Sequence, residues 1–374
     1  MKLIRFCILT IFFLFAGITF SANNIDNPDE HLPGKDYLKQ FAAKLAGYHT
    51  FDSFLVAVDN KIIYEQYFNG YSADKYHMIQ SSTKSITSIL IGILYDEGKL
   101  SLDETIGSLY PEQAIVNPIL NQITIENLLT MSSGLTWNEM VEPLFLPDGK
   151  ENPANDDIRM NYSGNWVEYV LTHSKTLAFK PGSKFDYNSG NSILLGDIIK
   201  KKTGLNAAVF AKKALFSKLG IFEFQWVLAP ISDSVTPNQL KIIDAGDIKD
   251  NDERQVHTGG GLLLRPRDMV KIGELMLNGG VYNGKKVLSA KWVEMSLTPY
   301  LQIPKEEVFY GFQWWRTILP NGHKMCFSAG VGGQFILFIP DLRTAFVVTG
   351  NMYRQAEANS LVLRAVYDFL IHMK

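Results

Sequence analysis

The sequence predicts an α+β fold in which strands from both ends of the chain form one antiparallel sheet, flanked by helices, with a mainly helical subdomain inserted between them. Two observations predict it. Strand-like stretches occupy residues 54–67 near the N-terminus and recur between residues 309 and 349 near the C-terminus. Helical spacing of apolar side chains and long loops dominate the residues from about 98 to 220.

The first 22 residues have the features of a secretory signal peptide. Lys2 and Arg5 precede an apolar or small run over residues 6–20, and residues 19–21 offer a small-x-small cleavage site. The run is short for a membrane span, which needs about 20 residues. We therefore expect a periplasmic or secreted protein with no stable membrane span after cleavage, and an uncleaved signal anchor is the alternative.

A polar linker is expected over residues 23–36 and the folded part over residues 37–374. Within the folded part, the sheet would come from residues 37–80 and 259–374. The helical part would come from residues 81–258.

The elements follow from apolar periodicity and turn residues. Residues 54–67 predict two strands joined by a turn at residues 59–61, and the helix over residues 82–97 ends at Gly98. The long segment 137–165 is typical of a lid or a disordered loop. Further helices are predicted at residues 37–45, 125–131, 166–173, 192–203, 266–277 and 357–373, and further strands at residues 309–318, 324–327, 333–339 and 344–349.

Composition excludes several classes of function. A net charge of −2 and an isoelectric point near 6.4 leave no basic surface for nucleic acid. No metal-binding spacing such as Cys-x-x-Cys is present, so no metal or cofactor is expected. Signal cleavage would remove Cys7 and leave Cys326 alone, so the mature chain would hold no internal disulfide.

The most informative local feature is a serine three residues before a lysine where a buried helix is predicted to begin. Ser81 and Lys84 would share one helical face, with their side chains within reach of each other. A neutral amine beside a serine can take its proton, and both burial and a helix N-terminus disfavour the charged amine. The pair therefore predicts a nucleophile with its base, although such spacing also occurs by chance.

Several ordered segments, beginning with this serine and lysine, resemble the serine β-lactamase-related hydrolases. That group is similar to class C β-lactamases, D-alanyl-D-alanine carboxypeptidases, certain esterases and 6-aminohexanoate-dimer hydrolases. The resemblance covers roughly residues 50–370 and implies a β-lactamase/transpeptidase-like fold. The segments that carry it are residues 81–85, 90–100, 123–135, 181–187, 194–196, 259–262 and 332–334.

The resemblance implies a second motif in which a tyrosine faces the serine and lysine, and its counterpart here is Tyr187. Such a tyrosine can act as general base in acylation and return the proton to the leaving group. Lactamases and carboxypeptidases usually have Tyr-x-Asn, whereas this chain has Tyr187-Asn188-Ser189. Ser189 is therefore expected at the substrate-contact position, as on the aminohexanoate-hydrolase and esterase side of the group.

The third motif departs further from the group's pattern. A strand-edge Lys-Thr-Gly or His-x-Gly is usual, but the comparable residues 327–330 contain no cation. His323 and Lys324 lie upstream and would serve only in a shifted register. Without a cation, a penicillin carboxylate would be left unpaired at a cost of about 1 to 3 kcal/mol. β-Lactam hydrolysis is therefore not the expected activity.

The oxyanion hole is expected from backbone N–H groups, that of Ser81 and those of the strand edge and turn at Gly330, Val331 and Gly332. Among the aromatic residues 310–315, most should pack in the core. One of Trp314 or Trp315 would line a substrate pocket, and Trp314 is the preferred candidate. His257 is expected to be a surface histidine, with an approach to the site as the alternative, and Asp156 and Asp157 are expected to be solvated loop charges.

The sequence thus predicts a secreted serine hydrolase that cleaves a small-molecule ester, amide or peptide through an acyl-enzyme on Ser81, with Lys84 and Tyr187 in proton transfer. Esterase, amidase and peptidase activities remain open. The alternative is a non-catalytic or penicillin-binding-type domain that captures cell-wall peptide or a small acyl ligand.

Overall fold

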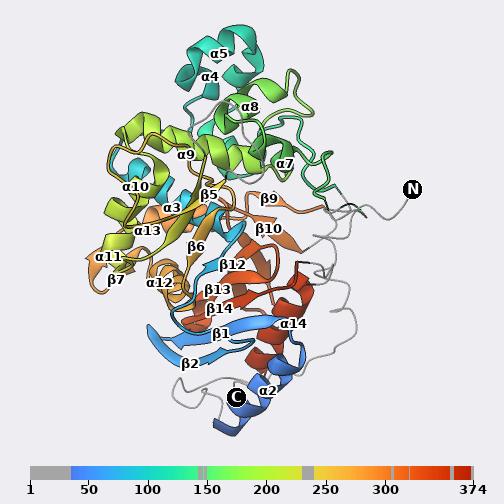
Figure 1. Cartoon of the computed structure of the whole chain (residues 1–374), viewed down its shortest axis with the longest axis vertical. Coiled ribbons are helices and arrows are strands. Elements are labelled where there is room, and N and C mark those ends of the chain that lie inside the picture. Colours follow the sequence, from blue (N-terminus) through green and yellow to red (C-terminus); the bar gives the residue numbers. More distant parts are fainter. Residues whose placement is uncertain are drawn as a thin grey trace.

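The computed structural model describes residues 35–141, 146, 150–229, 240–304, 307–319, 321–353 and 358–371. The predicted signal peptide and nearly all of the predicted linker lie outside these residues. Sheet and helices are layered as the sequence predicts, with the mainly helical part standing above the large sheet (Figure 1). No helix within the described ranges is long and apolar enough to cross a membrane.

The large sheet has eight antiparallel strands and joins the two ends of the chain. Its order is β2-β1-β14-β13-β12-β11-β10-β9, so the N-terminal hairpin pairs with the last strand. The strands are β1 (Phe51–Val58), β2 (Lys61–Tyr67), β9 (Leu301–Gln302), β10 (Val308–Tyr310), β11 (Trp315–Ile318), β12 (Lys324–Gly330), β13 (Gln334–Ile339) and β14 (Thr344–Gly350).

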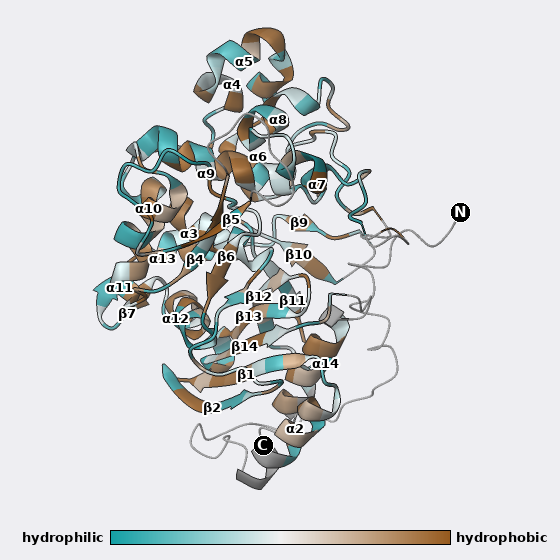
Figure 2. Ribbon diagram, viewed as in Figure 1, coloured by the Kyte–Doolittle hydropathy of each residue, from teal (hydrophilic) through white to brown (hydrophobic). Residues whose placement is uncertain are grey.

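Alternation along the strands gives the sheet two apolar faces. Leu55 and Ala57 of β1 belong to one hydrophobic cluster, and Phe54 and Val56 to the other. The second cluster is covered by α2 (Lys35–Gly47) and α14 (Ala358–Ile371), which lie side by side against the sheet (Figures 1 and 2). The first is covered by α12 (Pro266–Leu277) and α3 (Ser82–Asp96).

The helical part surrounds α3, in which every residue from Ser82 to Leu94 is buried. Its other helices are α4 (Ile106–Leu109), α5 (Pro111–Val116), α6 (Ile125–Leu129), α7 (Asp156–Asn161), α8 (Trp166–His173), α9 (Ser189–Thr203), α10 (Ala207–Ala211) and α11 (Ser217–Leu219), and α13 (Ala290–Ser296) packs against α3 from the C-terminal region.

Three features differ from the sequence prediction. A second sheet, β3-β6-β4-β5, is formed by β3 (His77–Met78), β4 (Gln225–Leu228), β5 (Lys241–Asp244) and β6 (Leu262–Leu264), short strands whose pairing is set by distant residues. The predicted strand over residues 309–318 is two strands, β10 and β11, because a turn containing Gln313 at φ 62° separates them. The predicted loop 137–165 contains α7, which Asn155 caps by accepting from two backbone N–H groups.

Candidate active site

Ser81 stands at the N-terminus of α3, directly after a strained turn. The preceding residue, Gln80, has φ 50°, a backbone conformation that costs energy for a residue with a side chain. Ser81 is partly exposed, whereas Ser82 is fully buried and its hydroxyl donates to the Gln334 carbonyl oxygen at 3.1 Å. The turn therefore presents one of the two adjacent serines to the outside and uses the other for packing.

Lys84 lies one turn further along α3, with its side chain only 2% exposed. Its Nζ is 3.0 Å from Oγ of Ser81 and donates to the Gly259 carbonyl oxygen at 2.6 Å. Burial lowers the pKa of the Lys84 amine, and the negative charges of Glu139 and Asp157 oppose that shift. An amine that donates to a carbonyl and has lost its proton would direct its lone pair elsewhere, and Ser81 is the neighbouring hydroxyl.

Tyr187 completes the predicted trio. Nζ of Lys84 lies 4.9 Å from the centre of the Tyr187 ring. The Trp315 ring stacks on the Tyr187 ring, with 6.1 Å between the ring centres. Burial raises the pKa of the Tyr187 phenol, the charge of Glu139 raises it further, and a hydrogen bond with Ser81 opposes the rise. Tyr187 is therefore a protonated phenol in the resting site, and of the two roles that the resemblance implies this state favours proton donation to the leaving group.

Ser189 lies in the same cluster, and its partner is a carboxylate that the sequence analysis missed. Glu139 accepts from the Ser189 backbone N–H and from the Ser189 hydroxyl, both at 2.6 Å, and from Nε1 of Trp137 at 2.9 Å. The Ser189 hydroxyl, which was expected to contact the substrate, thus already donates its hydrogen bond to Glu139. Asn188 caps α9 by accepting from the Asn191 N–H.

The structure corrects the predicted exposure of His257 and of the two aspartates at the start of α7. His257 is 8% exposed, not a surface residue, because it packs edge-on against Trp166 with ring centres 5.2 Å apart. Burial, followed by the charge of Lys84, lowers its pKa to about 4, so its ring is neutral. Asp156 is 3% exposed and accepts from the Asn138 N–H at 2.7 Å.

Asp157 is likewise not a solvated loop charge. Its Oδ1 is buried and has no hydrogen-bond partner among the described residues. Burial raises the pKa of the Asp157 carboxyl, while the charge of Lys84 lowers it. No spacing in the sequence links this residue to Lys84, because only the packing of α7 brings the two charges into range.

The glycine-rich end of β12 meets the Ser81 turn. A Cβ on Gly330 would come within 2.3 Å of the Ile79 carbonyl oxygen, so only glycine allows this approach of two backbones. Val331 follows with 45% of its surface exposed, and Gly332 has φ 87°. The turn thus lies next to the backbone that leads into Ser81, where the oxyanion donors were expected.

The two cations that the sequence offered for this strand edge do not lie at Gly330. Lys324 begins β12 at the end opposite Gly330, about 20 Å away along an extended strand, and His323 faces Asp341 at 3.4 Å. Within the described part of the chain, Lys84 is the cation whose charge acts on Glu139 and Asp157, and its Nζ lies over the Tyr187 ring. The described residues also include no cluster that could hold a metal ion.

The expected role of Trp314 in a substrate pocket is wrong. Its side chain is 0% exposed and packs edge-on against Phe338 in the core, with ring centres 5.5 Å apart. Trp315 points to the other face of the sheet, where it stacks near Tyr187. The two tryptophans belong to different hydrophobic clusters because adjacent residues of an extended segment face opposite sides.

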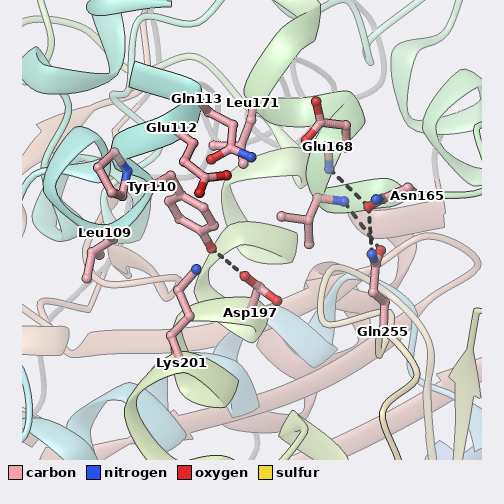
Figure 3. Close-up of a pocket in the computed structure, with 12 residues that line it drawn as sticks. Leu109, Tyr110, Glu112, Gln113, Asn165, Glu168, Leu171, Asp197, Lys201 and Gln255 are labelled. Carbon is pink, nitrogen blue, oxygen red and sulfur yellow. Dashed lines mark hydrogen bonds between the residues drawn. The ribbon is translucent and has the colours of Figure 1, made fainter. Parts of the chain in front are cut away.

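A cavity of about 420 Å³ elsewhere in the helical part has no residue in common with this cluster (Figure 3). It lies between Tyr110, whose hydroxyl donates to Asp197 at 2.7 Å, and the start of α8, where Gln255 accepts from backbone N–H groups. Two pairs of its polar side chains are hydrogen-bonded to each other, Tyr110 to Asp197 and Gln255 to Asn165.

Comparison with known proteins assigns the chain to a family. The family model described as Beta-lactamase matches residues 45–366. A 6-aminohexanoate-dimer hydrolase of Paenarthrobacter ureafaciens is 26% identical over 300 residues, which cover 77% of this chain and 69% of that protein. A lovastatin esterase of Penicillium rubens is 28% identical over 231 residues, 54% of this chain and 55% of the esterase.

Solved structures agree on the fold. A Bacillus anthracis protein provisionally named as a 6-aminohexanoate-dimer hydrolase superposes with a TM-score of 0.68 at 22% identity, covering 95% of this chain and 88% of that one. The α+β architecture with a sheet from both chain ends is therefore confirmed.

Proposed function

From the premise that this chain belongs to the Beta-lactamase family, we propose that it cleaves an ester or amide bond through an acyl-enzyme formed on Ser81. Family membership and the hydrolases among its relatives make it a serine hydrolase acting on such bonds. The observation that supports Ser81 as the nucleophile is the 3.0 Å separation between its Oγ and Nζ of the buried Lys84.

The proposed reaction has two stages, acylation of Ser81 and hydrolysis of the acyl-enzyme. In acylation, Oγ of Ser81 attacks the carbonyl carbon and its proton passes to the neutral Lys84 amine. The tetrahedral oxyanion is held by backbone N–H groups near Ser81 and Gly330. The Tyr187 phenol donates a proton to the departing alcohol or amine and is reprotonated from Lys84, which leaves the acyl group on Ser81.

Water completes the cycle. It attacks the acyl carbon and gives its proton to the Lys84–Tyr187 pair, and Oγ of Ser81 leaves with a proton as the acid is released. Lys84 suits this exchange because its amine lies within hydrogen-bond reach of Ser81 and its burial disfavours a permanent positive charge.

The substrate class we propose is an uncharged ester or linear amide at the scissile bond. The two curated relatives are named for an amide dimer and for an ester, which are both compatible with this site. Two carboxylates and the lack of a described cation beside the strand edge disfavour a substrate carboxylate there. β-Lactam and D-alanine-terminated substrates are accordingly expected to react poorly.

We further propose that the protein is exported, on the basis of Lys2, Arg5 and the apolar run that follows. Expression of the full chain in a bacterial host tests this proposal. A mature N-terminus near residue 22 in the periplasmic or culture fraction is expected, and an unprocessed chain in the membrane fraction would indicate a signal anchor instead.

The nucleophile is tested by incubating residues 23–374 with a fluorophosphonate and measuring the intact mass. One adduct is expected in the natural protein and in Ser82→Ala, and none in Ser81→Ala. Ser82 is a matched control because it is the adjacent serine and is buried. An adduct that survives Ser81→Ala would contradict the proposal, and saturable ligand binding without adduct or product would favour the binding-domain alternative.

A further inference from the structure

The site holds two carboxylates, Glu139 and Asp157, that the proposed proton transfers do not use. They come from separate elements, Glu139 from the segment before α7 and Asp157 from its first turn. Both act electrostatically on Lys84, and each acts on Tyr187. Two negative charges close to a general base call for a physical explanation, because burying them is costly.

Glu139 is fixed rather than mobile in this arrangement. Three donors hold its carboxylate: the N–H and the hydroxyl of Ser189, and the indole of Trp137. Ser189 in turn abuts Gly259, where an added Cβ would lie 3.4 Å from the Ser189 carbonyl oxygen. Gly259 supplies the carbonyl oxygen that binds Nζ of Lys84. A continuous series of contacts therefore connects the Glu139 carboxylate to the Lys84 amine.

Asp157, in the first turn of α7, also acts on the Lys84 amine. Its Oδ1 is buried without a partner among the described residues, and the charge of Lys84 opposes the rise that burial causes in the pKa of its carboxyl. His257, which also faces Lys84, is more than nine-tenths buried, and its Nδ1 has no partner among those residues either. Its neutral ring adds no positive charge, and the charged groups that act on Lys84 are Glu139 and Asp157.

The negative charge of the two carboxylates affects how strong a base Lys84 is in the proposed reaction. Burial lowers the pKa of the Lys84 amine and so favours its neutral form, but an amine whose pKa is lowered too far becomes a weak base toward a serine hydroxyl. Nearby negative charge raises the pKa again, typically by about 1 to 3 units for a close charge. Burial thus lowers the pKa of Lys84, and the two carboxylates raise it.

We propose that Glu139 and Asp157 are positioning residues that set the basicity of Lys84 and thereby the pH range in which Ser81 is activated. The inference rests on the proposed function, because it concerns the base of the same reaction. Besides each other, the carboxylates face Lys84 and Tyr187, and Glu151 also acts on Asp157. Neither carboxylate is assigned contact with the substrate or a direct proton transfer from Ser81.

The test measures the pH dependence of kcat/KM for a neutral ester, and of the rate at which the fluorophosphonate labels Ser81, in Glu139→Gln and Asp157→Asn. Each change removes one negative charge with little change of shape. Removing it lowers the pKa of Lys84, so activity should persist to lower pH, with the acid limb moving down by about one unit. The plateau rate should fall, because the amine is a weaker base.

Ser189→Ala is the matched control, since it removes one of the three hydrogen bonds to Glu139 and no ionisable group. Its acid limb should stay at the natural position whatever happens to its rate. Unchanged limbs in both charge variants, or an equal shift in Ser189→Ala, would overturn the inference. If one charge variant fails to fold, the other decides it. Absence of Ser81 labelling in the natural protein would instead overturn the proposed function, and the inference with it.

Discussion

Nζ of Lys84 lies 3.0 Å from Oγ of Ser81, at the buried start of α3. The separation is short enough for direct proton transfer, and the Gly259 carbonyl oxygen fixes the amine from the other side. Lys84→Met keeps the apolar stem and removes the amine. We expect kcat/KM for a neutral ester to fall by about 10²- to 10⁴-fold, with a retained melting temperature. Near-natural turnover in a folded variant would exclude Lys84 as the base.

Tyr187 is expected to matter most when the leaving group is poor. Its phenol is held protonated by burial and by Glu139, which both raise its pKa. An amine leaving group needs a proton, whereas p-nitrophenolate departs without one. Tyr187→Phe should therefore lower kcat for an anilide or alkyl amide at least tenfold more than kcat for the matching p-nitrophenyl ester. An equal loss on both substrates would argue against proton donation by Tyr187.

Gly330→Ala is expected to disable the site while leaving the rest of the fold intact. The new Cβ would lie 2.3 Å from the Ile79 carbonyl oxygen, so β12 must move away from the Ser81 turn. Displacing one oxyanion donor costs about 10²- to 10³-fold in kcat. The measurement compares kcat with the change caused by Gly246→Ala, where an added Cβ meets nothing within 4 Å. Full activity in Gly330→Ala would place the oxyanion donors elsewhere.

The adjacent tryptophans 314 and 315 should have separable effects. Trp314 is wholly buried in the core, so Trp314→Ala should lower the free energy of unfolding by about 3 to 5 kcal/mol. Trp315 stacks near Tyr187, so Trp315→Ala should change KM for esters more as the acyl chain lengthens. Urea denaturation and a series of chain lengths check the two effects. A KM that does not depend on chain length in Trp315→Ala would remove Trp315 from the substrate site.

His77 should make stability depend on pH below neutrality. It is 5% exposed and stacks on Tyr71, and burial lowers its pKa to about 4 from an unfolded value near 6.5. The unfolded chain therefore binds a proton between these values that the folded chain does not. The stability due to neutral His77 is complete above pH 6.5 and is lost progressively as the pH falls toward 4.

His77→Gln reports this contribution by difference. The gap in unfolding free energy between the natural protein and the variant should narrow by roughly 2 kcal/mol from pH 7 to pH 5. Urea titrations at both pH values measure it. The comparison between variants is needed because Asp52, 4.0 Å away, has a raised pKa and contributes with the opposite sign. A gap that is independent of pH would show that His77 titrates normally in the folded state.

Local pattern was sufficient for the features that depend on near neighbours. Ser81 and Lys84 are three residues apart on one helix, so their contact follows from helical geometry. Period-two alternation likewise predicts most strands of the large sheet, and the helix over residues 192–203 corresponds to α9, which extends back to Ser189 and ends at Gly204 as expected. The long-range closure of the sheet by β1 and β14 was foreseen because strands lie at both chain ends.

Only the tertiary structure decided the surroundings of Lys84. Its carbonyl partner Gly259 is 175 residues away, and Glu139 is 50 residues from the Ser189 that it binds. No periodicity links such residues, because their contacts depend on how β6, α7 and α9 pack around α3. For the same reason the sequence placed His257 and Asp156 in solvent and Trp314 at the site. The Ser81–Lys84 pair is local in the sequence, whereas the groups that surround it, Tyr187 and Gly330 included, are brought to it by packing.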